Sequence, residues 1–310
     1  MKFKQKISVE EIAKLIGAEI KGRKDLNVLG MNEIHKVEKG DLTFVDNHKY
    51  FQRSLDSAAS VIIINEDVKC PRGKTLLIHK SPFTVYNKLA KKFQPKRVLN
   101  REQAEDAQIH PTAIIEPNVV IGHNVTIGRD TYIQANSYIG NDTVIGDGVE
   151  IHAGTIIGTD AFYFHKRNKK YTKWHSIGRV VIENKVVIGA NCTINRGVSG
   201  DTVIGEGSKL DSQVHLGHGV VIGKHCLIAG QVGIGGKTIL EDHVVLFGQV
   251  GIAQNLRIGR GAIIAAKSGV SKDLAGGLTY FGTPAAEIKT KHRELAALRH
   301  LPDFYKDYYK

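Results

Sequence analysis

The sequence predicts a mainly β protein: a parallel β-helix of six-residue repeats, with a small α/β domain before it and a short helix after it. Three observations carry this prediction. An aliphatic residue recurs at every sixth position over two long runs. The chain has 33 glycines but only 7 prolines, which suits repeated tight turns. The first 95 residues lack the repeat and show helix and strand patterns instead.

The repeat itself defines the geometry. Isoleucine occupies every sixth position from Ile109 to Ile157, and isoleucine, leucine or valine does so from Ile204 to Val270. An α-helix cannot sustain a period of six, whereas short strands separated by turns can. The aliphatic position (i) and the small residue four places later (i+4) then face inward together. Three strands close a coil of about 18 residues, and about eight coils stack over residues 109–275 to form a prism.

Two segments interrupt the repeat. Residues 158–178 are predicted to form an insertion loop. Its aromatic and basic side chains suit an anionic ligand or partner, and a tolerated surface loop is the alternative. The slip at residues 198–201 is interpreted as a bulge.

The N-terminal segment, residues 1–95, is predicted to be a small α/β domain. A serine followed by acidic residues and apolar spacing predicts a capped helix over residues 8–20. Residues 60–68 and 74–81 predict buried strands, and residues 81–93 predict a second helix.

The remaining segments are a linker and a tail. Residues 96–108 are polar and charged, so we expect a linker there. Residues 276–310 are predicted to be a helical tail containing a short amphipathic helix with a basic side. That side is either solvated or a dock for an acidic carrier protein.

Composition limits the partners and the compartment. The formal net charge of +12 indicates a basic surface or an acidic partner. No nucleic-acid-binding motif is present, so we expect no nucleic acid partner. The three cysteines form no CxxC pair, which fits a reducing compartment. Without a recognisable signal peptide or membrane span, the sequence predicts a cytoplasmic protein with no stable membrane insertion.

Two histidines three residues apart, His215 and His218, raise the question of a site. His215 occupies position i−1 and His218 position i+2, both outside the predicted prism interior; His123 also occupies i+2. The first interpretation is therefore a pair of solvated surface histidines. A metal site is a second one, but three-imidazole zinc sites on such prisms use a His-x4-His pair, and this sequence has none. Cys192 and Cys226 fall at i+4, so we expect core residues there.

General-base chemistry is the third interpretation. A neutral imidazole can take a proton at cellular pH. Asp211 lies in the adjacent repeat and could orient such a ring. Gly236 follows His218 by one coil, and its backbone N–H could stabilise an oxyanion. A base and a donor one coil apart make an acyl-transfer geometry.

The sequence resembles the UDP-3-O-(3-hydroxyacyl)glucosamine N-acyltransferases of lipid A biosynthesis over nearly its whole length. The resemblance is carried by LTFVDNHKYF (42–51), GTDAFYF (158–164), GRVVI (178–182), NRGVSGDTVIGEGSKLDSQVHLGHGVVIG (195–223) and YFGTPA (280–285). It implies a left-handed β-helix, a homotrimer, active sites between neighbouring prisms and an N-terminal uridine-binding domain.

The resemblance also implies residue roles. Phe44 and Tyr50 would sandwich the uracil, with Asn47 hydrogen-bonding nearby; local packing is the alternative for the two rings. His218 would be the catalytic base and Gly236 the oxyanion donor, with Asp211 as a further catalytic residue and His215 near the substrate. The donor would be a hydroxyacyl thioester of acyl carrier protein, and neither a metal nor another cofactor would be needed.

The chain departs from the family pattern in a few places. Ser212 follows Asp211 where the family commonly has asparagine, and Gln254-Asn255 stands where a second histidine is often found. These positions bear on the acceptor sugar and on how the phosphopantetheine arm is held. A sugar acetyltransferase that uses acetyl-CoA, a paralogue acting on another UDP-amino sugar and a non-catalytic trimeric scaffold are the alternatives.

Overall fold

The computed structural model describes residues 1–167 and 169–309. They form two compact units. Unit 1 comprises Met1–Val98, Asp160–Arg179 and Arg196–Asp201. Unit 2 comprises Leu99–Thr159, Val180–Asn195 and the chain from Thr202 onward. Both interruptions of the repeat, the expected insertion loop and the expected bulge, therefore group with the N-terminal segment.

Unit 1 is built on a mixed sheet covered by helices. Its strands run in the order β1-β3-β4-β5-β6-β2, and the inner pairings from β3 to β6 are parallel. The strands are β1 (Lys2–Ser8), β2 (Glu19–Gly22), β3 (Asn27–Met31), β4 (Asp41–Val45), β5 (Val61–Ile64) and β6 (Thr75–Ile78). The helices are α1 (Val9–Ile16), the 3-10 turn η1 (His48–Tyr50), α2 (Phe51–Leu55) and α3 (Pro82–Phe93).

The helices and strands predicted in unit 1 are present, but the helix expected over residues 8–20 ends at Ile16, because Gly17 adopts a left-handed conformation and Glu19–Gly22 form strand β2. Ser8 caps α1, because its hydroxyl accepts a hydrogen bond from the Glu11 N–H at 3.1 Å. All four residues of β5 are buried, as a continuous apolar run between parallel neighbours requires. The hairpin of β16 (Phe164–Arg167) and β17 (Lys170–Lys173) completes the unit.

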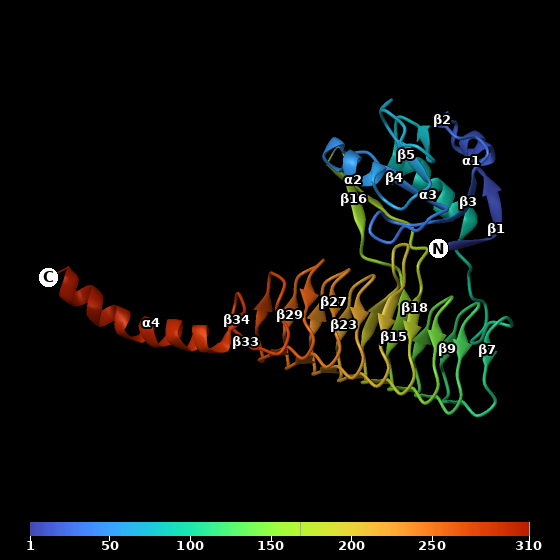
Figure 1. Ribbon diagram of the computed structural model, residues 1–310. Helices are drawn as coiled ribbons and strands as arrows, with labels where there is room; N and C mark the ends of the chain where they lie inside the picture. The colour runs from blue at the N-terminus through green and yellow to red at the C-terminus, as the bar shows by residue number, and fades with distance from the viewer. Residues whose placement is uncertain (168, 310) are drawn as a thin grey trace. The chain divides into compact units, whose positions relative to one another are not determined.

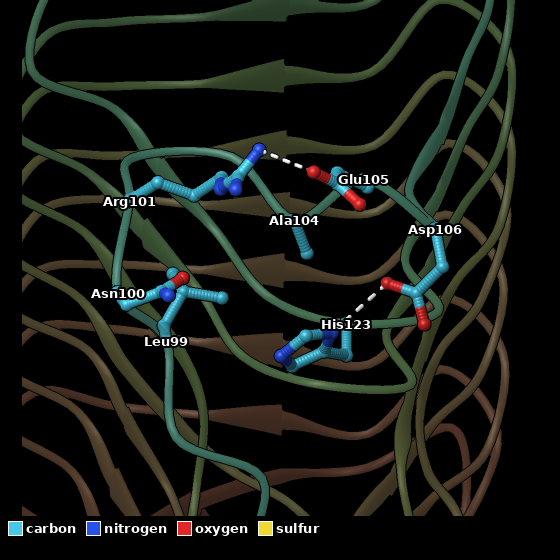
Figure 2. Close-up of a pocket in the computed structure, with 7 residues that line it drawn as sticks. All are labelled: Leu99, Asn100, Arg101, Ala104, Glu105, Asp106 and His123. Carbon is cyan, nitrogen blue, oxygen red and sulfur yellow. Dashed lines mark hydrogen bonds and ion pairs between the residues drawn. The ribbon is translucent and has the colours of Figure 1, made fainter.

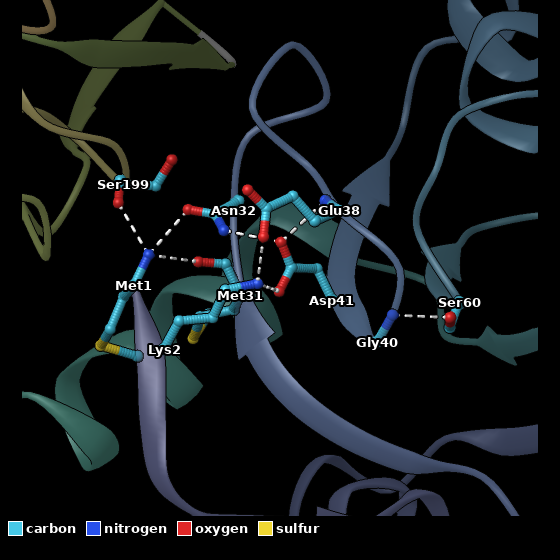
Figure 3. A network of polar contacts seen from close by, with 9 residues as sticks. All are labelled: Met1, Lys2, Met31, Asn32, Glu38, Gly40, Asp41, Ser60 and Ser199. Atoms are coloured by element: carbon cyan, nitrogen blue, oxygen red, sulfur yellow. Dashed lines mark hydrogen bonds and ion pairs between the residues drawn. The ribbon is translucent and has the colours of Figure 1, made fainter.

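A polar network joins strands β1 and β4 of unit 1 (Figure 3). Asp41 is fully buried, and its carboxylate accepts hydrogen bonds from the Asn32 side chain at 2.7 Å and the Glu38 N–H at 2.9 Å. The Lys2 ammonium lies 2.9 Å from the same carboxylate. These partners stabilise the buried charge.

Unit 2 is the predicted prism, formed by three parallel sheets that run its length (Figure 1). The first sheet contains β7 (Gln108–Ile109), β10 (Thr126–Ile127), β13 (Val144–Ile145), β18 (Val180–Ile182), β21 (Thr202–Ile204), β24 (Val221–Ile222), β27 (Ile239–Leu240) and β30 (Arg257–Ile258). The second sheet contains β9 (Val120–Ile121), β12 (Tyr138–Ile139), β15 (Ile156–Thr159), β20 (Thr193–Asn195), β23 (His215–Leu216), β26 (Gly233–Ile234), β29 (Gly251–Ile252) and β32 (Gly269–Val270).

The third sheet closes the triangle. It contains β8 (Ile114–Ile115), β11 (Tyr132–Ile133), β14 (Glu150–Ile151), β19 (Val187–Ile188), β22 (Lys209–Leu210), β25 (Leu227–Ile228), β28 (Val245–Leu246), β31 (Ile263–Ile264) and β33 (Thr279–Phe281), with β34 (Ala286–Glu287) antiparallel to β33. The fold class is thus the predicted left-handed hexapeptide β-helix. The chain stays in the prism beyond Val270, through β33.

The interior follows the predicted pattern. Aliphatic residues at position i and small residues at i+4 form one core, which includes Ile228, Val232 and Val244. Cys192 and Cys226 lie in this core, as predicted, and are at most 1% exposed. Burial raises the pKa of the Cys192 thiol to about 11.

Glycine at position i+1 has a steric cause. A β-carbon on Gly217 would lie 2.6 Å from the backbone nitrogen of Gly236 in the next coil, and one on Gly235 would lie 2.6 Å from that of Gln254. Such a contact is too short for any side chain, so the stacked corner excludes a β-carbon at these sites.

The C-terminal helix is longer than expected. Helix α4 (Ile288–Tyr308) has 21 residues, none of them buried, and continues from the C-terminal end of the prism (Figure 1). It remains helical through Pro302, where the sequence suggested only a short helix. Within the described chain, no helix has the length and apolar character needed to span a bilayer.

Candidate active site

His218 lies at the corner between the second and first sheets, between β23 and β24. Its side chain is only 5% exposed, although position i+2 lies outside the interior column. The interpretation of His218 as a solvated surface histidine is therefore wrong. Its carbonyl oxygen accepts a hydrogen bond from the Lys237 N–H at 2.8 Å, which ties this corner to the next coil.

Gly236 occupies the same corner one coil further along. A β-carbon on Gly236 would lie 2.7 Å from Nε2 of His218 and 2.9 Å from Cδ2, so the imidazole covers its α-carbon. Only glycine leaves room for the ring in this position. The sequence prediction that base and donor lie one coil apart is consistent with this contact.

The Gly236 N–H differs from comparable amides at other corners. The N–H of Arg129 is capped by Asp147 Oδ1 at 2.8 Å, and that of Lys224 by Asp242 Oδ1 at 2.9 Å. In the described part of the chain, the Gly236 N–H donates no hydrogen bond. An imidazole beside an unused amide can accept a proton and stabilise a developing oxyanion within one small volume.

His123 shows that the register alone does not make this arrangement. It occupies the same type of position near the start of the prism, beside a cavity of about 390 Å³ (Figure 2). Its Nδ1 lies 3.0 Å from Asp106 Oδ1, and its backbone N–H is capped by Asn141 Oδ1 at 2.7 Å. Asparagine stands where the His218 corner has glycine, and its side chain lies against the backbone of His123.

His215 lies on strand β23 and is exposed. Partial desolvation by the surrounding wall lowers the pKa of its imidazole, even though much of the side chain is accessible in the single chain. The lowered pKa keeps the His215 imidazole neutral near pH 7, and its exposure leaves it available for contact with a ligand.

Asp211 does not meet His218 within the chain. It lies at the corner between the third and second sheets, where its Oδ1 accepts a hydrogen bond from the Ser212 N–H at 2.7 Å. Among the described residues, no hydrogen bond or ion pair joins Asp211 to His218. The predicted orienting contact is therefore not made by this chain on its own.

The corner that carries Ser212 also holds a groove of about 530 Å³, which the sequence did not reveal. Its lining consists of small residues at successive i+2 positions, the glutamines beside them and one lysine: Ser212, Gly230, Gly248, Ala266, Gln213, Gln231, Gln249 and Lys267. The glutamine side chains form a ladder with hydrogen bonds of 2.8 and 2.7 Å. Four small residues in a row at one corner are the signal that would have located it.

The predicted uridine-binding residues all belong to unit 1. Phe44 is half-buried and packs against other aromatic rings, with centroids 4.9 Å from Tyr86 and 5.2 Å from Trp174. Asn47 Oδ1 accepts a hydrogen bond from the Lys49 N–H at 3.0 Å, and Tyr50 is 45% exposed. The local packing of Phe44 is thus present, and the Tyr50 ring is available to a ligand.

The described residues contain no group of three or more histidine, cysteine or acidic side chains placed to hold a metal ion. The three cysteines are free thiols. Burial raises the pKa of the Cys226 thiol, as it does for Cys192, so neither residue is a nucleophile at neutral pH.

Comparisons with known proteins agree with this architecture. The profile of UDP-3-O-(3-hydroxymyristoyl) glucosamine N-acyltransferase, LpxD, matches residues 25–92. The bacterial transferase hexapeptide profile matches residues 106–141, 125–159 and 201–236. Among solved structures, the UDP-N-acetylglucosamine acyltransferase of Francisella novicida matches 60% of this chain and 67% of its own, with a TM-score of 0.52 and 28% identity. The UDP-N-acetylglucosamine O-acyltransferase of Moraxella catarrhalis matches 66% of this chain and 80% of its own, with a TM-score of 0.52 and 26% identity.

Curated relatives are named UDP-3-O-acylglucosamine N-acyltransferase. The protein from Methylobacterium sp. (strain 4-46) is 36% identical over 49% of this chain but only 44% of its own length. The Wolinella succinogenes protein is 37% identical over 88% of this chain and 92% of its own. The Parvibaculum lavamentivorans protein is 45% identical over 96% of this chain and 94% of its own. On this evidence the chain belongs to the UDP-3-O-acylglucosamine N-acyltransferase family.

Proposed function

We propose that the protein transfers a 3-hydroxyacyl chain from acyl carrier protein to the 2-amine of a UDP-3-O-acylglucosamine, as a step of lipid A biosynthesis. The observation that carries this proposal is the His218 imidazole packed on Gly236, beside a backbone N–H that donates to nothing in the described chain. Membership of the family supplies the substrate class.

The reaction needs one proton acceptor and one oxyanion donor. His218 takes a proton from the 2-amine as its nitrogen attacks the thioester carbonyl, and the Gly236 N–H donates to the oxygen that becomes negative. The C–N bond forms, and the C–S bond then breaks. The imidazolium returns the proton to the departing sulfur, so the products are an amide and the free thiol of the carrier.

Uracil binding and contact with the acceptor substrate are assigned to separate groups of residues. We assign uracil binding to Phe44, Asn47 and Tyr50, of which Tyr50 offers an exposed ring. His215 is assigned to substrate contact because it is exposed on β23, the strand that leads into the corner of His218. We retain Asp211 as a contributor to catalysis, with its partner in the assembled enzyme rather than in its own chain.

The donor is assigned to basic and apolar surfaces of unit 2. The groove of about 530 Å³ has a floor of small residues, which suits an extended acyl or pantetheine chain. Acyl carrier protein is acidic, so the formal charge of +12 favours its association. Helix α4 carries exposed Lys289, Arg293 and Arg299, which we assign to carrier docking. If so, reversing these charges raises KM for carrier-bound donors but not for a short pantetheine thioester.

We infer a homotrimer, with the first sheet contributing to contact between copies. Five consecutive strands of that sheet present aliphatic side chains on their outer side, in register one coil apart: Val144, Val181, Val203, Val221 and Ile239. These side chains are only partly buried in the single chain. A continuous apolar face of this kind is typical of a subunit interface. Three free thiols favour the reducing cytoplasm as the compartment.

Mass spectrometry of the product tests the proposal. The protein is incubated with UDP-3-O-acylglucosamine and a panel of hydroxyacyl carrier-protein thioesters, with acetyl-CoA in parallel. We expect the mass of the acceptor to increase by one hydroxyacyl group. The product should no longer react with amine reagents, which places the new group on the 2-amine. Acetylation from acetyl-CoA alone would favour the sugar acetyltransferase alternative. No acylation with any donor would favour the non-catalytic scaffold.

A further inference from the structure

A repeated backbone hydrogen bond ties many corners of the prism to the coil before them. The donor is the backbone N–H at position i+3 of a repeat. The acceptor is the backbone carbonyl at position i+2 of the repeat one coil earlier. At the active-site edge, Lys237 donates to His218 at 2.8 Å and Asn255 donates to Gly236 at 2.9 Å. The same bond recurs elsewhere, as from Asp142 to His123 at 2.8 Å. It fixes the peptide plane at the corners where it forms.

The corner of His218 lacks the usual acceptor. By register, the Gly219 N–H should meet the carbonyl of Arg196, but the preceding coil is interrupted there: β20 ends at Asn195, and the chain rejoins the prism only at Thr202. The Gly219 N–H instead donates to the Thr202 hydroxyl at 2.8 Å. That hydroxyl donates in turn to the Asn195 carbonyl at 2.7 Å. A side-chain oxygen thus replaces a backbone oxygen.

We propose that Thr202 is a positioning residue for His218, an inference that rests on the proposed function. The peptide between His218 and Gly219 is held at both ends, its carbonyl by the Lys237 N–H and its N–H by the Thr202 hydroxyl. Gly219 has a φ of +67°, so its conformation is set by these bonds rather than by a side chain. Thr202 is fully buried, so its hydroxyl is shielded from bulk solvent.

Loss of the hydroxyl releases one end of that peptide. The peptide plane can then rotate, which moves the His218 ring away from Gly236, and the distance between proton acceptor and oxyanion donor changes. Displacements of about 1 Å at a reacting centre lower rates by about 100-fold, while substrate binding elsewhere is unaffected. The expected signature is therefore a loss in kcat with little change in KM.

Thr155 provides a matched control. It is also a fully buried threonine of the prism, donating to the Gly189 carbonyl at 2.8 Å and accepting from the Cys192 N–H at 3.2 Å. Its hydrogen bonds hold an ordinary core position and not the corner of His218. Replacing either threonine by valine keeps the volume and removes one buried hydroxyl.

The test is steady-state kinetics of acyl transfer with Thr202→Val, Thr202→Ser and Thr155→Val, alongside thermal unfolding of each. We expect Thr202→Val to lower kcat by about 10- to 100-fold with KM changed less than about threefold. Serine retains the hydroxyl, so Thr202→Ser should stay within about threefold of wild type. Thr155→Val should lose a similar amount of thermal stability while kcat is retained. Equal losses of kcat in both valine variants would overturn the assignment, as would a wild-type kcat in Thr202→Val.

Two further measurements keep the inference testable if Thr202→Val does not fold. A large loss of kcat in Thr202→Ser would contradict the role of the hydroxyl, and so would rapid hydrogen exchange of the Gly219 amide in the wild-type protein. His218→Ala is assayed in parallel. If His218→Ala loses turnover but Thr202→Val does not, only the positioning role fails; if His218→Ala retains turnover, the proposed function of the corner fails instead.

Discussion

The His218 imidazole lies over the α-carbon of Gly236, so closely that a β-carbon on Gly236 would be 2.7 Å from Nε2. This contact brings a proton acceptor next to an amide that donates to nothing in the described chain. It also gives Gly236 two separate reasons to be glycine: space for the ring and access to its own N–H.

Gly236→Ala tests that contact. The added methyl group must displace the imidazole, so we expect kcat for acyl transfer to fall by about 10- to 100-fold. Gly251→Ala is the control, because a β-carbon there meets no atom within 4 Å. Wild-type kcat in Gly236→Ala, measured on protein of unchanged thermal stability, would be incompatible with the described geometry.

The core prediction concerns two adjacent residues of strand β25. Ile228 points into the prism and is 0% exposed, whereas Leu227 points outward and is 53% exposed. We expect Ile228→Ala to lower the free energy of unfolding by about 2–5 kcal/mol through lost burial and a residual cavity. Leu227→Ala should change it by no more than about 0.5 kcal/mol. Denaturant titration measures both, and comparable losses would contradict the assigned register.

The Cys192 thiol predicts a pH dependence of stability. Burial raises its pKa from 9.0 to about 11, so the folded state holds the proton more tightly than the unfolded state. The resulting stability is fully present below pH 9 and is lost between pH 9 and 11. At pH 10 the free energy of unfolding has fallen by about 1 kcal/mol from its value below pH 9. Denaturant titrations at pH 8 and 10 should show a smaller loss for Cys192→Ala than for wild type. Equal losses would show that the thiol does not titrate as described.

The outer face of the first sheet predicts the effect of a charge on assembly. Val221 lies in the middle of the aliphatic row, in register with Val203 and Ile239. Because a buried carboxylate is costly, Val221→Asp should shift the protein from trimer to monomer in light scattering. Lys209→Glu, on the exposed side of the third sheet, is the control and should leave the trimer intact. An unchanged trimer in Val221→Asp would place the interface elsewhere.

Much of the fold could be predicted because one rule is repeated. Each hexad from Ile109 onward places its aliphatic residue in the same column, so errors at one repeat are corrected by the next. Helices α1 and α3 and strands β5 and β6 were also readable from caps and apolar runs, whereas strands β1 to β4 were not predicted. The grouping of residues 160–179 and 196–201 with unit 1 was not, because it depends on contacts distant in sequence. The length of α4 was missed because Pro302 suggested an end to the helix.

The site was only partly readable. The one-coil spacing of His218 and Gly236 follows from the period, but the burial of His218 does not. Nothing in the sequence separates His218 from His123 by register alone; the difference lies in the residue stacked on each, Gly236 or Asn141. The role of Thr202 was hidden for a similar reason, since its partner Gly219 is distant along the chain and becomes its neighbour only through coil stacking.

The most direct measurement compares acyl transfer by wild type, His218→Ala and His123→Ala. All three are assayed for kcat with a hydroxyacyl carrier-protein donor and UDP-3-O-acylglucosamine. We expect His218→Ala to lower kcat by about 10²- to 10⁴-fold because the general base is lost, while His123→Ala keeps the wild-type rate. If His218→Ala turns over at the wild-type rate, or if both variants lose activity equally, the corner of His218 and Gly236 is not where the acyl chain is transferred.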